Sequence, residues 1–363
     1  MRASNRRFPI LFLAMLAVIL LWGTAVLTGL SVRRVVDALR KPSLTPRVPT
    51  RSVVSSSIAL REIWRRPGLT TIYSDLQSGL VGTQGYAAIV TTERAGESPN
   101  RIYVLDAGSG ELRWRSDWIP YVHSLVINGD SLVAVVNWEV RSYGLLMGEL
   151  KWKSGPLPDH AGYRIDPTPS GQIAVYSIDD TANTWMQTIR FFDANTGTLI
   201  RIDSMETKPD IFLVQEGRDP SIWVSRTKLW ASTSGGGEPL WEYSLDGRVS
   251  TWPIEYGGLL LFAAGTFANV EAIELATGNL AWESERQFVS NIDLNASLLY
   301  GISMNGSVIA LDASSGAEIG AIRTEPALTE MDSRKTAYWI EAFGDTVLAY
   351  FGDSMELIAF APN

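Results

Sequence analysis

Cysteine is absent from this chain of 363 residues, and histidine occurs only twice. Without a thiol there is no disulfide, no zinc–thiolate site, no cysteine nucleophile and no attachment point for a lipoprotein-type acyl anchor. His123 and His160 stand apart, and no Ser/His/Asp arrangement or glycine-rich phosphate loop accompanies them. The acidic pair Asp179-Asp180 fits an ordinary acidic turn better than a calcium site. We therefore expect no catalytic residue, no cofactor site and no metal site.

Most of the chain has few basic residues compared with its acidic ones. Residues 1–66 hold 12 Lys and Arg against 2 Asp and Glu, whereas the remainder holds 19 against 37. An acidic domain argues against a nucleic-acid partner, because binding to phosphates needs a basic surface. The basic front instead suits the anionic surface of a membrane.

Long hydrophobic runs are also rare, and the exception is residues 8–30, which carry no charge. At 1.5 Å per residue such a helix crosses a bilayer core of about 30 Å. The basic segment 1–7 precedes it, so a cleaved signal peptide is the alternative. The stretch Leu27-Thr-Gly-Leu-Ser31 is a poor cleavage site, which favours a transmembrane α-helix as a permanent anchor.

A linker follows over residues 31–60. Residues 31–40 are compatible with a juxtamembrane continuation of the helix, and residues 41–51 contain three prolines, which make an extended and semi-rigid spacer. Basic residues flank the hydrophobic segment on both sides, so the distribution of positive charge alone does not decide the orientation of the anchor.

The rest of the chain contains a repeat marked by a glycine four residues before a fixed position that is often Trp. The glycines are spaced 38, 49, 40, 41 and 38 residues apart, and they are Gly110, Gly148, Gly197, Gly237, Gly278 and Gly316. The fixed position is occupied by Trp114, Trp152, Arg201, Trp241, Trp282 and Gly320. Self-similarity at about 40 residues is typical of a β-propeller.

Each unit reads as an apolar strand, a five-residue turn such as Asp193-Ala-Asn-Thr-Gly197, and a strand that ends at the Trp position. Asp and Asn favour such turns by binding nearby backbone N–H groups, and glycine accepts a positive φ without steric cost. Two further apolar runs complete four strands per unit. The predicted fold class is therefore all-β, a propeller of four-stranded antiparallel blades over residues 61–363.

The number of blades follows from the two ends of the domain. A seventh unit reaches Glu356–Phe360, where the Trp strand is missing, and Arg61-Glu-Ile-Trp64 supplies such a strand at the other end. We predict seven blades closed by this N-terminal strand, which removes an open sheet edge. Eight blades are the alternative if the 49-residue spacing hides an extra unit. We assign that extra length instead to turn-rich segments such as residues 156–159 and 179–183.

At Asp193-Ala-Asn-Thr-Gly197 and at Leu275-Ala-Thr-Gly-Asn-Leu-Ala-Trp282 the chain resembles the pyrroloquinoline-quinone-like (PQQ-like) β-propeller repeat. The resemblance covers roughly residues 61–363. It implies that the repeat tryptophans dock between neighbouring blades as structural residues, and these are Trp64, Trp114, Trp152, Trp241 and Trp282. Arg201 and Gly320 depart from the pattern, so we expect different packing in the third and sixth blades.

The resemblance also implies a function. Its relatives include a non-catalytic scaffold of the outer-membrane assembly type, and most are extracytoplasmic. We therefore expect a single-pass protein of the bacterial cytoplasmic membrane, with an extracytoplasmic propeller that binds other proteins of an envelope complex. Quinone-dependent dehydrogenases are the alternative, but they hold quinone and calcium over a vicinal disulfide that this cysteine-free chain does not have. An exported ligand-binding sensor is a third reading.

Thirteen tryptophans are more than the repeat requires. The off-repeat tryptophans of the propeller are Trp118, Trp138, Trp185, Trp223, Trp230, Trp252 and Trp339. Tryptophan is enriched at the energetic centres of protein interfaces. Because Trp185 lies in the longest repeat unit, the sequence favours it as the candidate partner contact.

Overall fold

The computed structural model describes residues 58–71, 79–92, 99–158, 163–181, 184–207, 212–213, 220–225, 227–233, 238–247, 249, 252–265, 268–324 and 337–362. The predicted basic segment 1–7, the predicted anchor 8–30 and nearly all of the linker 31–60 lie outside these residues. Within them, no helix is long and apolar enough to cross a bilayer.

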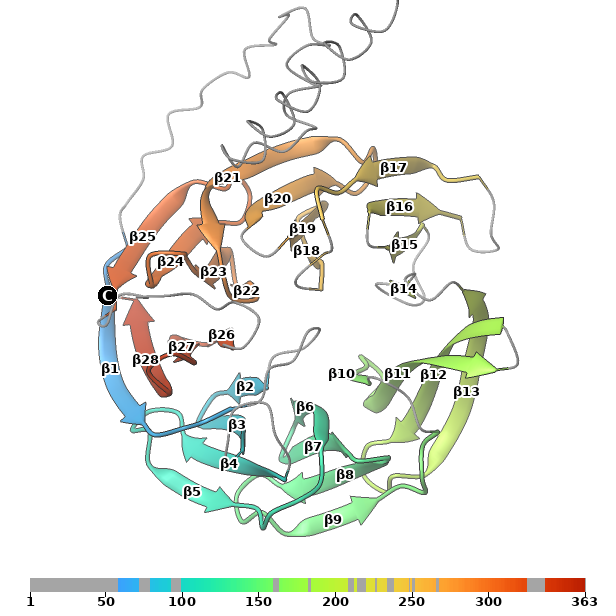
Figure 1. The fold of residues 1–363 in the computed structure, drawn as a ribbon, viewed down its shortest axis with the longest axis vertical. Helices are drawn as coiled ribbons and strands as arrows, with labels where there is room; N and C mark the ends of the chain where they lie inside the picture. Colours follow the sequence, from blue (N-terminus) through green and yellow to red (C-terminus); the bar gives the residue numbers. More distant parts are fainter. Residues whose placement is uncertain are drawn as a thin grey trace, which may run out of the picture. The chain divides into compact units, whose positions relative to one another are not determined.

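Seven four-stranded antiparallel sheets form a ring of blades (Figure 1). Blade 1 comprises β2 (Leu80–Thr83), β3 (Tyr86–Thr92), β4 (Asn100–Asp106) and β5 (Leu112–Arg115). Blade 2 comprises β6 (Val122–Asn128), β7 (Ser131–Val136), β8 (Glu139–Gly144) and β9 (Leu150–Lys153). Blade 3 comprises β10 (Arg164–Pro167), β11 (Gln172–Thr181), β12 (Thr184–Asp193) and β13 (Leu199–Thr207).

The next three blades repeat this order. Blade 4 comprises β14 (Phe212–Leu213), β15 (Ser221–Val224), β16 (Lys228–Ser232) and β17 (Trp241–Ser244). Blade 5 comprises β18 (Ile254–Tyr256), β19 (Leu259–Ala263), β20 (Ala268–Glu274) and β21 (Leu280–Phe288). Blade 6 comprises β22 (Asp293–Asn295), β23 (Leu298–Ile302), β24 (Ser307–Asp312) and β25 (Glu318–Arg323). In each blade the first strand lies nearest the centre of the ring and the fourth lies at the rim (Figure 1).

Blade 7 joins the two ends of the domain. Its strands β26 (Tyr338–Phe343), β27 (Thr346–Phe351) and β28 (Glu356–Pro362) come from the C-terminal end, and β1 (Leu60–Pro67) pairs with β28 from Leu60↔Pro362 to Pro67↔Glu356. The order β1-β28-β27-β26 confirms both the seven-bladed ring and its closure by the N-terminal strand. This pairing removes the free edge that β28 would otherwise expose.

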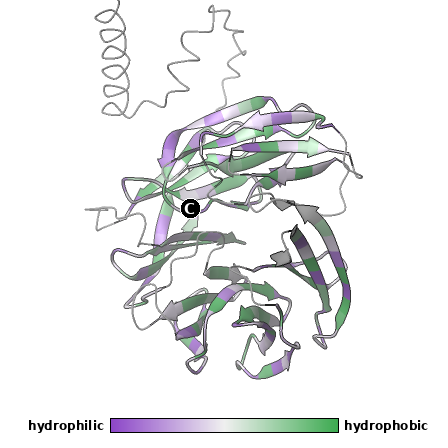
Figure 2. Ribbon diagram, turned by 45° about the vertical axis from the view of Figure 1, so that its right-hand side comes forward, coloured by the Kyte–Doolittle hydropathy of each residue, from purple (hydrophilic) through white to green (hydrophobic). Residues whose placement is uncertain are grey.

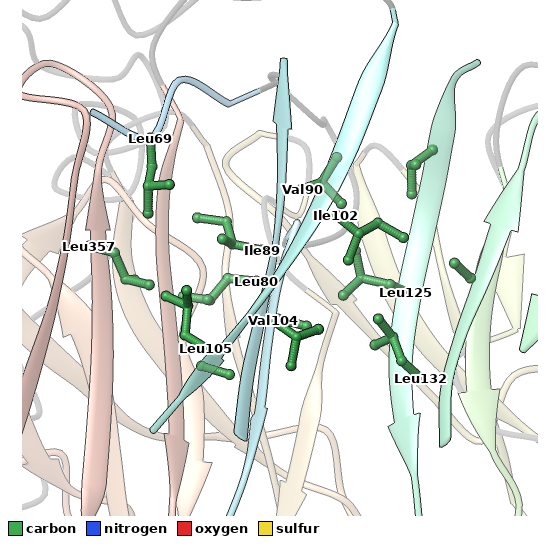
Figure 3. Packing of buried hydrophobic residues seen from close by; sticks show 14 of the residues in the cluster. Leu69, Leu80, Ile89, Val90, Ile102, Val104, Leu105, Leu125, Leu132 and Leu357 are labelled. Carbon is green, nitrogen blue, oxygen red and sulfur yellow. The ribbon is translucent and has the colours of Figure 1, made fainter. Parts of the chain in front are cut away.

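The core lies between adjacent blades rather than within one. All six residues of β7 are buried, and alternate side chains enter different clusters: Leu132 and Ala134 pack toward blade 1, Val133 and Val135 toward blade 3. This follows from the two-residue period of a strand, which sends successive side chains to opposite faces. Figure 2 shows hydrophobic stretches along many strands, interrupted by hydrophilic positions. Figure 3 shows one such interface, where Leu357 of blade 7, Leu80 of blade 1 and Leu125 of blade 2 contribute to a single cluster.

The hairpin before each fourth strand has a recurring geometry. In blade 1 the N–H of Gly110 donates to the carbonyl of Asp106 (2.8 Å), and Oδ1 of Asp106 accepts the N–H groups of Gly108 and Ser109 at 3.0 and 2.9 Å. Blade 2 has Gly144 where the Asp stands elsewhere. A Cβ on Gly144 would lie 2.1 Å from the carboxylate of Glu149, so the Glu149 side chain fills the space of the missing one.

The 49-residue spacing does not come from an extra blade. Blade 3 has long strands instead: β11 and β12 have ten residues each and β13 has nine. Residues 179–181 lie in β11, and Asp180 pairs with Trp185 of β12. The assignment of residues 179–183 to a turn was therefore wrong for residues 179–181, because these polar residues extend a hairpin.

Candidate interaction surface

The repeat tryptophans lie at the boundaries between blades. Each indole of this set packs against the turn glycine of the following blade, where a Cβ would lie 2.3–2.6 Å from a ring atom; the pairs are Trp64–Gly110, Trp114–Gly148, Trp152–Gly197, Trp241–Gly278 and Trp282–Gly316. All five glycines have φ between 69° and 76°. The glycine is therefore needed twice, because its backbone is left-handed and its α-carbon contacts the ring.

Hydrogen bonds fix four of these rings. The indole N–H donates over 2.8–2.9 Å to a backbone carbonyl in the turn of the next blade, and the pairs are Trp64–Ala107, Trp114–Leu145, Trp152–Ala194 and Trp241–Leu275. In Trp282 the buried N–H has no acceptor among the described residues. The predicted turn residue Gly237 lies outside the described residues.

The two off-pattern positions are compensated by their neighbours. A repeat Trp pairs across the hairpin with a small residue, such as Ala231 or Ala272. In blade 3 the sizes are exchanged, because Phe191 is the large buried partner and the guanidinium of Arg201 lies 3.9 Å from the centre of its ring. In blade 6 a Cβ on Gly320 would lie 2.3 Å from the carbonyl oxygen of Ile58, and Ile58 donates its N–H to Ile319 (2.7 Å).

Since the repeat residues hold the blades together, a binding site has to be sought among the others. His123 is the centre of an aromatic cluster at the boundary of blades 2 and 3. Its ring centroid lies 4.7 Å from that of Tyr121 and 5.3 Å from those of Trp138 and Tyr163. Tyr163 is buried, whereas Tyr121 is 40% exposed, so the cluster runs from the core to the surface.

Three connecting segments bring this cluster together. Tyr121 lies on the crossing from blade 1 to blade 2, Trp138 in the turn between β7 and β8, and Tyr163 on the crossing from blade 2 to blade 3. The carbonyl of Tyr121 accepts the N–H of Asn137 (2.6 Å), and the carbonyl of Trp138 accepts that of Leu157 (2.5 Å). These backbone bonds hold the segments in place, so the aromatic side chains belong to a preorganised surface.

The same crossing segment carries a second exposed aromatic. Trp118 is 38% exposed, and the guanidinium of Arg101 lies 4.0 Å from the centre of its ring, a cation–π contact. The bridge between Asn100 and Ile119 anchors the segment to blade 1, and Oδ1 of Asn100 accepts the N–H of Val122 (2.6 Å). We call Arg101, Trp118, Tyr121, His123 and Trp138 the aromatic surface.

The remaining off-repeat tryptophans are dispersed. Trp223 stacks on Trp230 with centroids 6.3 Å apart, the guanidinium of Arg164 lies 4.2 Å from the ring centre of Trp252, and Trp339 is buried against Gly79. Trp185 is placed only by its backbone, in β12 opposite Asp180 and Thr207. Its role as a partner contact stays a prediction.

Two carboxyl groups deep in the ring also break the repeat. Asp293 of β22 accepts the N–H groups of Ala342 (2.6 Å) and Leu294 (2.9 Å), and Glu341 of β26 accepts that of Gly82 (3.0 Å). The inner strands of blades 6, 7 and 1 are thereby linked in series. Burial raises the pKa of Asp293 to about 6; burial and then the negative charge of Asp293 raise the pKa of Glu341 well above its usual range.

Amide side chains extend this linkage on both sides. Asn291 exchanges two hydrogen bonds with the backbone of Ile340, at 2.8 and 2.9 Å, and the amide of Asn295 donates to the carbonyl of Gly344 (2.6 Å). The carboxyl pair therefore belongs to a continuous polar seam between blades 6 and 7. Within the described residues no group of three or more His, Asp or Glu side chains is arranged to hold a metal ion.

Several of these residues were not found from the sequence. The cluster around His123 joins residues from three connections, and His123 sits at a register shift between β6 and β7, where no strand periodicity signals its direction. For the carboxyl pair a signal exists once the hairpins are aligned on their inner turns: the position of Asp293 and Glu341 is occupied by Val81, Val126 and Ile254 in three other blades.

Comparison with known proteins agrees with this architecture. The family model described as outer membrane protein assembly factor BamB matches residues 185–324. No curated protein matches the sequence. Among solved structures, BamB from Moraxella catarrhalis has 13% identity and a TM-score of 0.47, covering 83% of this chain and 97% of its own. The computationally designed Ika8 protein has 12% identity and a TM-score of 0.47, covering 80% and 99%.

A third solved structure extends the comparison to a larger protein. Raptor from Chaetomium thermophilum has 12% identity and a TM-score of 0.60, covering 83% of this chain but only 29% of Raptor. At such identity the likeness concerns the propeller fold, which hosts many unrelated functions. The chain is a seven-bladed β-propeller, and over residues 185–324 its repeat resembles that of the outer-membrane protein assembly factor.

Proposed function

We propose that this propeller is a non-catalytic scaffold that binds a partner protein of a bacterial envelope complex through its aromatic surface. The observation that carries the proposal is the exposure of Trp118 and Tyr121 on a segment fixed by backbone hydrogen bonds, with Arg101 stacked on Trp118. Trp, Tyr and Arg are the residue types that most often dominate the binding energy of protein interfaces. A segment that is already ordered loses little conformational entropy on binding.

The family match supports an accessory role. The matching model carries the name of an assembly factor of outer-membrane proteins, and it covers the chain from β12 of blade 3 to the end of blade 6. By analogy, the partner is a component of an envelope assembly machine, and no cofactor is required.

The anchor and its orientation form the second part of the proposal. The hydrophobic segment 8–30 would hold the chain in the cytoplasmic membrane, with the propeller on the extracytoplasmic side. A reporter fused after residue 363 tests this. A periplasm-active reporter should give signal and a cytoplasm-active one should not; the reverse pattern contradicts the orientation.

Co-purification from detergent-solubilised membranes tests the scaffold. The full chain should recover one or more proteins in stoichiometric amounts, and Trp118→Ala combined with Tyr121→Ala should lose them. Met304→Ala is the matched control, because Met304 is equally exposed (40%) and lies on the turn between β23 and β24 of blade 6. Loss of binding in both variants, or in neither, would contradict the assignment of the surface.

A separate arm tests Trp185. If the partner also reaches the long hairpin of blade 3, Trp185→Ala weakens recovery without lowering the stability of the propeller. Unchanged recovery would remove Trp185 from the interface and leave the aromatic surface as the binding site.

A further inference from the structure

The rim strand of blade 3 pairs along only one edge with the described strands. β13 is the last strand in the order β10-β11-β12-β13, has nine residues and lies at the outside of the ring (Figure 1). Leu199, Ile200 and Ile202 on this strand are 45%, 48% and 51% exposed. A long, apolar edge strand is a template for pairing with another strand.

Two of the other rim strands are short and basic. β5 reads Leu-Arg-Trp-Arg, β9 reads Leu-Lys-Trp-Lys, and both have only four residues. Short length and positive charge are the usual means by which an edge strand avoids a partner. β21 also has nine residues, but Glu283 and Glu285 flank Ser284 with charges of the same sign, so a self-pair centred there is repulsive. The rim strand β25 is approached at Ile319 by the backbone of Ile58.

β13 begins Leu199-Ile-Arg-Ile-Asp203, with opposite charges on either side of Ile202. In an antiparallel pair of two copies centred on Ile202, Arg201 of each copy stands opposite Asp203 of the other, and Ile200 stands opposite Ser204. The same operation on β5 or β9 brings Arg against Arg or Lys against Lys. Opposite charges directly across a strand pair stabilise it, and like charges destabilise it.

We propose that two copies of this chain associate through β13, as an antiparallel strand pair with its two-fold axis at Ile202, which joins the two third blades into one eight-stranded sheet. The occupant is a second copy because the strand is complementary to itself in charge. Arg201 and Asp203 already lie 3.2 Å apart within one chain, with side chains 51% and 37% exposed, so both charges are accessible to a second strand. An interface of this kind is isologous and closes on a dimer.

The absence of cysteine makes a direct test simple. In an antiparallel pair, residues opposite each other have α-carbons about 4.5–5.5 Å apart, within the range of about 4.4–6.8 Å that a disulfide accepts. Ile202→Cys in the full chain in detergent micelles should therefore form a covalent dimer on mild oxidation. Leu280→Cys on β21 is the control, with similar exposure (48%) on a rim strand of equal length; it should remain monomeric.

A charge-complementation experiment separates pairing between chains from the ion pair within one chain. Arg201→Asp and Asp203→Arg should each weaken self-association roughly tenfold, measured by sedimentation equilibrium, because each places like charges across the axis. A mixture of the two variants should form heterodimers, since all the crossed charges are then opposite. An ion pair that acts only within each chain predicts no recovery on mixing.

Three results would overturn the proposal. The first is a chain that stays monomeric in detergent micelles at a protein concentration of about 100 µM. This is far above the concentrations at which typical specific interfaces form. The second is equal cross-linking of Ile202→Cys and Leu280→Cys. The third is a dimer that survives Ile202→Lys, which places two positive charges together at the axis. Each would show that β13 is free or is covered by another partner.

Discussion

Trp282 packs against Gly316 of the following blade, as the other repeat tryptophans do with their glycines, but its indole N–H finds no acceptor among the described residues. Trp114 makes the same contact with Gly148 and also donates its N–H to the carbonyl of Leu145 over 2.8 Å. The two sites therefore share the packing of the ring and differ in one hydrogen bond. The repeat supplies its own matched pair of sites.

Replacing the indole with a phenyl ring tests what that hydrogen bond contributes. Trp114→Phe loses ring volume and leaves the carbonyl of Leu145 without its donor, whereas Trp282→Phe loses the same volume and removes an unsatisfied N–H. We expect the free energy of unfolding to fall by about 1–2 kcal/mol more for Trp114→Phe than for Trp282→Phe. Urea unfolding of both variants measures the difference, and equal losses would show that packing alone holds the blades.

The turn glycines test the packing half of the contact. Gly316 has φ +70°, and its Cβ would lie 2.4 Å from the Trp282 ring, whereas Gly129 has φ +60° and no atom within 4 Å of its Cβ position. Gly129→Ala should lower the free energy of unfolding by about 1 kcal/mol, through backbone strain alone. Gly316→Ala should lower the free energy of unfolding by at least twice that amount, because the half-buried ring of Trp282 has to move.

A double mutant shows whether the ring is the cause. In a Trp282→Ala background the Cβ at position 316 no longer overlaps the indole ring. Gly316→Ala should then lower the free energy of unfolding only by the backbone strain of its positive φ. An additive double mutant would mean that Gly316 is needed only for its positive φ.

The repeat made most of the architecture predictable, and the reason is physical. A Gly at the turn and a Trp four residues later specify a hairpin and a contact with the next blade. Trp64, which stands at the N-terminal end of the domain without such a turn before it, locates the ring closure in blade 7. What the repeat does not encode is the alignment of one blade on the next. The pairing of Asp293 with the backbone of Ala342 depends on that alignment, 49 residues away along the chain.

The two positions where the repeat Trp is replaced were predictable from the sequence to different degrees. Arg201 could have been understood from the sequence, because Phe191 replaces the small residue that faces a repeat Trp across the hairpin. Gly320 could not, because the atom that occupies its space is the carbonyl oxygen of Ile58, which comes from the opposite end of the domain.

The contact between Gly320 and Ile58 gives a third prediction. A methyl group at Gly320 would lie 2.3 Å from that carbonyl oxygen. Gly320→Ala should therefore displace the backbone at residue 58, just before β1, and lower the free energy of unfolding by about 1–3 kcal/mol. The amide of Ile58, which donates to Ile319, should exchange faster with deuterium. Gly108→Ala is the control: its Cβ position meets only the Asp106 carboxylate, at 3.4 Å, and we expect no change at residue 58.

The carboxyl pair predicts an unusual dependence of stability on pH. Asp293 and Glu341 both have raised pKa values, that of Asp293 being about 6, against ordinary values of about 3.9 and 4.3 in an unfolded chain. At pH values between the unfolded and the folded pKa of each group, the folded protein holds more protons than the unfolded one. The free energy of unfolding therefore falls as the pH rises from about 4.5 through the pKa of Asp293 at about 6.

Other carboxylates act in the opposite direction and at lower pH. Hydrogen bonds from Thr196 and Asn195 lower the pKa of Asp193, so its stabilising contribution is present above its unfolded pKa and is lost as the pH falls below it. Asp193→Asn should thus lower stability by a constant amount above about pH 4.5, remove the pH dependence that Asp193 produces below about pH 4, and leave the slope above pH 4.5 unaltered. This variant serves as the control for the buried pair.

Glu341→Gln tests the pair itself. The amide oxygen still accepts the N–H of Gly82, while the carboxyl group whose pKa is raised by burial and by the charge of Asp293 is gone. Asp293, whose pKa is raised by burial, is then the only member of the pair that still binds its proton more tightly in the folded chain. The decline in stability between pH 4.5 and 7.5, measured by urea unfolding across that range, should become smaller by about 1–3 kcal/mol. Groups that titrate elsewhere cancel in the comparison with the parent chain. A variant with the same slope as the parent would mean that the pKa of Glu341 is not raised in the folded chain.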